Sequence, residues 1–240
     1  MDDSGQSFIR ANYQLVKQKI AGAARSAGRD PASIKLVVVT KGHPVQAVQQ
    51  ALAAGVRLLG ENYTDEGVAK KLACGAGGVE WHMIGHVQSR KAQSVVVHFD
   101  WLHSLDRLKL ARRLDQFASQ VGRKLPVLLE CNVSGEETKF GWPAWQETGW
   151  PALAEEIGQV LTLPHLDVRG LMTMAPFLPD PEQARPFFVR LRRLQEFLAG
   201  CFPALDWREL SMGMSADFEV AVQEGATILR IGTAIMGPRP

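Results

Sequence analysis

The sequence predicts an α/β fold, a single (β/α)8 barrel with an extra N-terminal helix. After an amphipathic first segment, residues 6–27, short apolar or β-branched runs alternate with longer segments of helical period, the pattern of parallel βα units. Eight such runs occur, the number that a closed barrel of this type requires. The 240 residues fit one domain over 1–240, since α/β barrels reach this length undivided. A doubly wound open sheet is the alternative.

The expected strands are short and rich in apolar or β-branched residues. They are residues 35–41, 57–61, 80–84, 101–104, 126–133, 167–172, 207–211 and 228–231. The expected helix starts are Pro44, Tyr63, Ser89, Asp106, Pro143, Pro181 and Ser215. Several of them carry a proline or a capping residue, because the first turn of a helix tolerates proline and its free N–H groups need an acceptor.

The composition, 46% hydrophobic and 22% charged, is that of an ordinary soluble protein. A formal net charge of +2 and the absence of a dense Lys/Arg block argue against nucleic acid or an anionic membrane as partner. Cys74, Cys131 and Cys201 are far apart, which suggests neither a disulfide framework nor a zinc site. The acidic start and the lack of a ~20-residue apolar run predict neither export nor membrane insertion. We therefore expect a cytoplasmic protein.

Lys41 is the first candidate functional residue, because barrel enzymes carry their sites at the C-terminal ends of the strands. It ends the run LVVVTK, in which Val37, Val39 and Lys41 share one face by the two-residue period of a strand. If that face is the barrel interior, desolvation lowers the lysine pKa and leaves neutral amine to form a Schiff base with an aldehyde. The alternative is a lysine that snorkels at a strand end.

Two glycine-containing loops near the C-terminus indicate a phosphate site. SMGMSADF places small residues and a helix cap, Ser215, where backbone N–H groups can hold an anion. RIGTAIMG then places Gly232 and Thr233 at the end of the last strand. A tight turn explains either loop alone, but barrels bind phosphate at the loops after strands 7 and 8, and these two loops together favour a phosphate-bearing ligand.

Several polar residues accompany these loops. Arg230 shares strand parity with Gly232, so an inward guanidinium would need an acceptor, either a pyridine nitrogen in a phosphate-anchored ring or a buried carboxylate. His82 is expected to be a hydrogen-bonded barrel histidine that also contacts the ligand. Its spacing from His86 falls on a strand and turn, which disfavours a metal pair, and we expect no metal site. Glu61 and Asn62 either hydrogen-bond the ring or tether a loop.

The ordered segments TKGHP, GENYTDE, WHMIGHVQSRK, NVSGEETKFG and LSMGMSADFEVAVQEGATILRIGTAIMG resemble the pyridoxal phosphate homeostasis proteins, the YggS-like or PROSC-type family. The resemblance implies a barrel similar to the N-terminal domain of alanine racemase, with pyridoxal 5'-phosphate (PLP) held on Lys41 as an aldimine. It further implies the following cofactor contacts: Ser215, Gly232 and Thr233 at the phosphate, Arg230 at the pyridine nitrogen, and Asn62, Ser211 and Met212 lining the pocket. Gly42, His43, Arg90 and Met236 depart from the residues usual in the family.

The resemblance implies a role in vitamin B6 homeostasis and cofactor supply to apo-enzymes, without established catalytic turnover. The residues agree, since a two-base racemase needs a second proton donor and the sequence holds only Tyr13 and Tyr63, neither of which we nominate. No second domain is expected to cover the barrel mouth, and we expect a monomer. The alternatives are a PLP-dependent amino-acid racemase or decarboxylase, and a cofactor-free barrel enzyme with an aldolase-type lysine.

Overall fold

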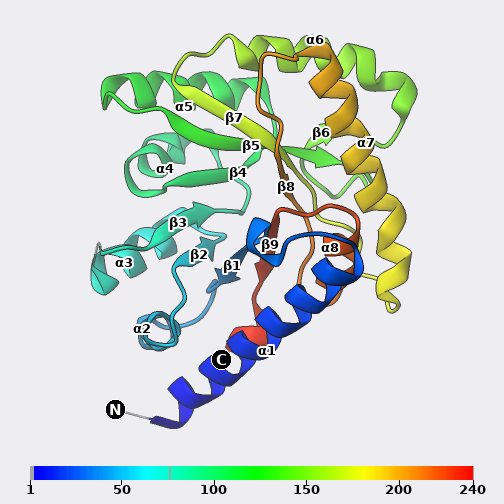
Figure 1. The fold of residues 1–240 in the computed structure, drawn as a ribbon. Helices are drawn as coiled ribbons and strands as arrows, with labels where there is room; N and C mark the ends of the chain where they lie inside the picture. Colours follow the sequence, from blue (N-terminus) through cyan, green and yellow to red (C-terminus); the bar gives the residue numbers. More distant parts are fainter. Residues whose placement is uncertain (1–2, 76, 240) are drawn as a thin grey trace.

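The computed structural model describes residues 3–75 and 77–239, and these residues form a closed barrel of parallel strands surrounded by helices (Figure 1). Its eight strands are β1 Lys35–Val39, β2 Leu58–Glu61, β3 Glu80–Met83, β4 Trp101–Leu105, β5 Leu125–Asn132, β7 Leu166–Met172, β8 Glu209–Ser211 and β9 Ile228–Ile231. Each strand pairs with the next in this order, and β9 pairs with β1. The predicted barrel is confirmed. A further two-residue strand, β6 Trp142–Pro143, pairs with the end of β5.

Helices cover the outside of the barrel. They are α1 Asp3–Ser26, α2 Val45–Ala53, α3 Thr64–Cys74, α4 Ala92–His98, α5 Leu108–Gln120, α6 Trp150–Leu161, α7 Arg185–Cys201, α8 Phe218–Gln223 and α9 Thr233–Met236. The N-terminal helix α1 packs against α2, α8 and α9, beside the strands where the barrel closes (Figure 1). None of the helices in the described chain combines the length and hydropathy that a transmembrane segment requires.

The apolar core is divided between the outside and the inside of the barrel. The larger cluster fills the space between strands and helices. The smaller one consists of four buried residues from β1, β5, β7 and β9: Val37, Leu128, Met172 and Ile228. Buried polar side chains, among them His82 of β3, His103 of β4 and Arg230 of β9, accompany this small layer. The barrel interior therefore combines an apolar layer with buried polar side chains.

Several expected element boundaries are wrong, two of them after β1 and β5. The expected helix start at Pro143 is part of β6, and α6 begins at Trp150. Proline suits a strand edge as well as a first helical turn, so its presence does not choose between them. The first strand ends at Val39, two residues before its expected end, and Lys41 therefore lies in the turn that follows.

Gly170 on β7 is required by a close approach of two strands. Its φ is +152°, and an added Cβ would lie 1.9 Å from the backbone oxygen of Glu209 on β8. Gly170→Ala should lower the free energy of unfolding by more than about 3 kcal/mol in urea titrations, since neither backbone can move without breaking the pairing. Gly158→Ala on α6 is the control, because its Cβ would meet only Phe202, at 3.7 Å. Equal stability of the two variants would contradict the strand spacing.

Candidate functional site

A cavity of about 370 Å³ opens at the C-terminal end of the barrel. Six of the expected site residues line it: Lys41, Asn62, Ser215, Arg230, Gly232 and Thr233. They come from the turns after β1 and β2, from the loop after β8, and from β9 and the turn after it. Closure of the barrel between β1 and β9 thus brings together groups from both ends of the chain.

Lys41 is half-buried and lines this cavity. Val39 lines the same cavity, so the inward face of the strand continues into the turn. Burial lowers the pKa of the Lys41 amine, and the positive charges of Arg239 and Arg230 lower it further. A larger fraction of the amine is therefore neutral and nucleophilic near neutral pH than for a free lysine.

A buried ion-pair network fixes the turn that carries Lys41. Lys70 Nζ on α3 donates to the Thr40 carbonyl at 2.6 Å, to Glu61 Oε1 at 2.8 Å and to Glu66 Oε1 at 2.6 Å. Thr40 Oγ1 donates to Glu61 Oε1 at 2.5 Å, and the Gly42 N–H donates to Glu66 Oε1 at 2.6 Å. Glu61 thus tethers the loop, one of its two predicted roles. The role of Lys70 in holding this turn was not predicted, because the sequence does not show which carboxylates a helical lysine contacts.

The two glycine-containing loops present unpaired backbone N–H groups on the same cavity. Among the described residues, none accepts a hydrogen bond from the backbone N–H of Ser215, Ala216 or Thr233, all three of which line the cavity. Gly232, between β9 and α9, has no side chain to cover these groups. Free N–H groups at a concave surface attract phosphate oxygens.

Ser215 does not cap the helix that follows it. α8 begins at Phe218, and Asp217 precedes it, with Asp217 Oδ1 accepting from the Met214 N–H at 2.6 Å. The Asp217 carboxylate closes the turn 214–217 and delays the helix start. Ser215 Oγ instead accepts from the Ala234 N–H of α9 at 3.2 Å. It thereby joins the two loops that carry the free N–H groups.

Arg230 is buried, with 4% of its surface exposed. Its two terminal nitrogens donate to Ser211 Oγ at 2.6 Å and to the Thr173 carbonyl at 2.8 Å. No carboxylate in the described part of the chain forms an ion pair with it. Burial lowers the pKa of the guanidinium to about 10, against the opposing effect of Glu130 and Asp217. A buried cation with spare donors at a cavity wall favours a ligand acceptor there.

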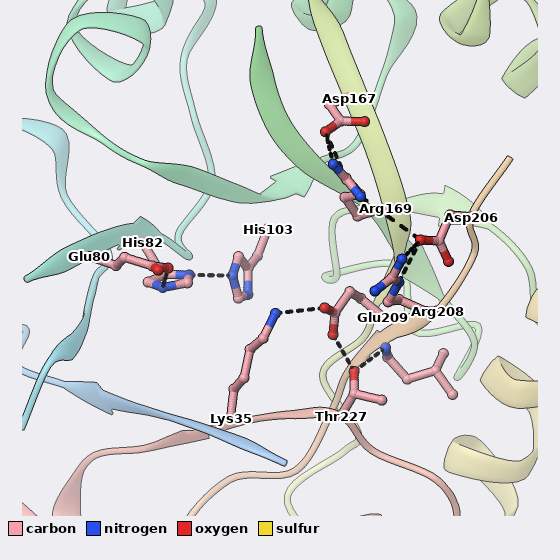
Figure 2. Close-up of polar contacts among 11 residues, drawn as sticks. Lys35, Glu80, His82, His103, Asp167, Arg169, Asp206, Arg208, Glu209 and Thr227 are labelled. Atoms are coloured by element: carbon pink, nitrogen blue, oxygen red, sulfur yellow. Dashed lines mark hydrogen bonds and ion pairs between the residues drawn. The ribbon is translucent and has the colours of Figure 1, made fainter. Parts of the chain in front are cut away.

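Three expected site residues lie away from the cavity wall. Ser211 is fully buried behind Arg230, which donates to its hydroxyl. Met212 is also fully buried and belongs to the larger apolar cluster between the strands and the helices. His82 lies deeper in the barrel, where Nδ1 is 2.9 Å from His103 Nε2 (Figure 2). Its ring stacks on Trp101. None of the described residues forms a metal-binding cluster of three or more His, Cys, Asp or Glu.

A second cavity of about 530 Å³ adjoins the first and shares Asn62, Ile84 and Met174 with it. Glu130 of β5 lines this second cavity although only 3% of its surface is exposed. Burial and the nearby Asp106 raise its pKa to about 7, and Arg230 partly opposes them. Glu130 was not predicted as a site residue. Its position within the apolar run VLLEC indicates a buried carboxylate and could have identified it.

The sequence is similar to that of known proteins over nearly its whole length. Residues 7–240 match the family model described as alanine racemase, N-terminal domain. The chain is 43% identical over 234 residues to the pyridoxal phosphate homeostasis protein of Pseudomonas aeruginosa, covering 97% of this chain and 96% of the relative. The chain belongs to the pyridoxal phosphate homeostasis protein family. Its identity to the Escherichia coli K12 member is 40%, over 96% of this chain and 97% of that relative.

Solved structures agree with this family assignment. PipY of Synechococcus elongatus with PLP bound is 37% identical, has a TM-score of 0.78, and is matched over 91% of this chain and all (100%) of PipY. An alanine racemase of Clostridium difficile is only 16% identical, with a TM-score of 0.71, and 57% of its length is matched by 98% of this chain. The racemase shares the barrel fold, while PipY also shares the family.

The raised pKa of Glu130 makes stability depend on pH. With a folded-state pKa of about 7 against an ordinary 4.5, the folded protein keeps this proton where the unfolded chain releases it. Wild-type stability should therefore fall relative to Glu130→Gln as pH rises from 4.5 to 7, by about 3 kcal/mol in total, and the difference should then stay constant. Urea unfolding of both proteins across this range measures the difference. A difference that does not change with pH would show that folding does not raise the pKa of Glu130.

Proposed function

We propose that this protein binds PLP on Lys41 and acts in vitamin B6 homeostasis as a carrier of the cofactor. The observation that carries the proposal is the joining of three groups at one cavity: an amine of lowered pKa, free backbone N–H groups and a buried guanidinium. They match the aldehyde, the phosphate and the pyridine nitrogen of PLP respectively. The PLP-bound structure of the relative PipY supports the same choice of ligand.

The residues present fit the cofactor. PLP supplies an aldehyde that condenses with a primary amine, and Lys41 is the amine lining this cavity whose pKa is lowered. The N–H groups of Ser215, Ala216 and Thr233 would hold the phosphate. Arg230, which stays charged at neutral pH, would donate to the ring nitrogen and keep it unprotonated, since a guanidinium is a much weaker acid than a pyridinium. An unprotonated nitrogen makes the ring a weaker electron sink.

The same residues favour a carrier over a racemase. A racemase needs a held proton donor on each face of its substrate. Tyr13 lies on α1 outside the barrel. Tyr63 is 65% exposed at the start of α3, and no described residue accepts a hydrogen bond from its hydroxyl. Phe177, which lines the cavity, is 89% exposed, so the cavity is accessible from solvent. We propose that a monomer delivers PLP to apo-enzymes through this opening.

The cofactor assignment is tested by the absorbance spectrum with added PLP, followed by borohydride reduction and peptide mass analysis. We expect a near-visible band and a pyridoxyl mass on the peptide that contains Lys41. Lys41→Ala should abolish both, whereas the control Lys109→Ala, an exposed lysine of α5, should retain them. A band that survives in Lys41→Ala overturns the assignment, and a trapped adduct derived from a substrate without PLP would establish the aldolase-type alternative.

The carrier role is tested by incubating the loaded protein with amino acids and, separately, with an apo-enzyme that requires PLP. We expect recovery of the apo-enzyme's activity and no steady conversion of the amino acids. The free cofactor at the same concentration is the control for transfer. Steady racemisation or decarboxylation that disappears in Lys41→Ala would instead make the protein a PLP enzyme.

A further inference from the structure

A chain of buried polar contacts runs from Arg230 through the barrel interior toward its N-terminal end. Arg230 donates to Ser211 Oγ at 2.6 Å, and Ser211 Oγ lies 2.9 Å from His103 Nδ1. His103 Nε2 lies 2.9 Å from His82 Nδ1. His82 Nε2 lies 3.5 Å from Glu80 Oε2 without forming a hydrogen bond to any described residue, and the Glu80 side chain is 54% exposed (Figure 2). The chain thus connects the cavity wall with the far opening of the barrel.

The partners at its two ends fix the direction of these hydrogen bonds. Arg230 has only donors, so Ser211 Oγ accepts from it and is free to donate its proton to His103 Nδ1. His103 then carries its proton on Nε2 and donates to His82 Nδ1. His82 Nε2–H is left facing the Glu80 carboxylate, which is attractive. The reverse order would direct a lone pair of His82 at that carboxylate and leave the Ser211 proton without this acceptor.

The surroundings keep both imidazoles neutral, as this order requires. Burial lowers the pKa of His82, against Glu80 and Asp100, which raise it, and with a further lowering by Lys35. Burial lowers the pKa of His103 well below its usual value, and His82, Arg230 and Lys35 add to the effect. Trp101 packs against both rings, with its ring stacked on His82 and edge-on to His103. Each imidazole therefore presents one donor and one acceptor in a fixed orientation.

Two anchors set the plane of the Arg230 guanidinium. One terminal nitrogen is held by the Thr173 carbonyl, which is part of the backbone and cannot rotate. The other is held by the Ser211 hydroxyl, which can rotate unless its own proton is bound. His103 binds that proton, so the second anchor depends on a residue that does not line the cavity.

We propose that His103, supported by His82, is a positioning residue that orients the Arg230 guanidinium toward the bound ligand through Ser211. The proposal rests on the proposed function, because it takes the ring nitrogen of PLP as the acceptor of Arg230. It adds residues that act on the cofactor from a distance and assigns the purpose of a buried histidine pair.

Two substitutions at position 103 separate positioning from mere filling of space. His103→Leu removes both hydrogen-bonding atoms, whereas the amide of His103→Gln offers one acceptor and one donor at a similar separation. His165→Leu is the control, since His165 contacts Asp115 on the outside of the barrel. For each protein, the near-visible band is titrated with PLP to give the affinity and with pH to give the midpoint of the spectral change.

We expect His103→Leu to weaken PLP binding by roughly tenfold to a hundredfold, the effect of losing the hydrogen bond from the charged Arg230 to the ring nitrogen when the guanidinium is no longer oriented, and to shift the pH midpoint. His103→Gln should restore both values toward wild type, and His165→Leu should change neither. If His103→Leu does not fold, Ser211→Ala provides the test, because it deletes only the hydroxyl and should produce the same two changes.

A folded His103→Leu or Ser211→Ala protein with wild-type affinity and an unchanged pH midpoint overturns the positioning role, while a Lys41-dependent band in wild type leaves the cofactor assignment intact. A loss of affinity in His103→Leu that His103→Gln does not restore, with an unchanged midpoint, assigns His103 to packing alone. Failure of wild type to bind PLP overturns both proposals together.

Discussion

The pairing of β1 with β9 is the constraint on which the site depends. Its register places Val37 beside Arg230 and Val38 beside Ile231. Because the strands are parallel, their C-terminal ends meet at one rim, and the turn with Lys41 lies beside the turn with Gly232 and Thr233. A shift of one residue would turn Arg230 out of the barrel, since side chains alternate between the two faces. One strand pair thus determines which chemical groups share the cavity.

Burial gives these groups their chemical character. Burial and the positive charges of Arg239 and Arg230 lower the pKa of Lys41. The buried Arg230 has no ion pair within the described residues. Such a polar interior is stable only if its members satisfy one another. Lys70 satisfies the buried polar groups next to the Lys41 turn through its bonds to Thr40 and Glu61. His82 and His103 satisfy the polar groups that contact Arg230 through Ser211. The cavity groups therefore remain available for a ligand while the residues behind them are held.

The alternation of strand and helix periods was enough to predict the barrel, while strand parity left the inward direction of Lys41 and Arg230 as one of two alternatives. A two-residue alternation shows from local sequence alone which side chains share a face of a strand. The helix cap assigned to Ser215 was wrong, because Asp217, two residues later, closes the turn instead. His103 and Lys70 were missed for a different reason. Their importance comes from partners far away in the sequence, and no local pattern identifies those partners.

A crystal structure of the protein grown with PLP would show whether the three groups at the cavity hold the cofactor. We expect continuous density from Lys41 Nζ to the cofactor, and phosphate oxygens within hydrogen-bonding distance of the N–H groups of Ser215, Ala216 and Thr233. We also expect the Arg230 guanidinium to face the ring nitrogen while it still donates to Ser211. A cofactor bound elsewhere, or with its phosphate away from these loops, would contradict the proposed binding of PLP on Lys41.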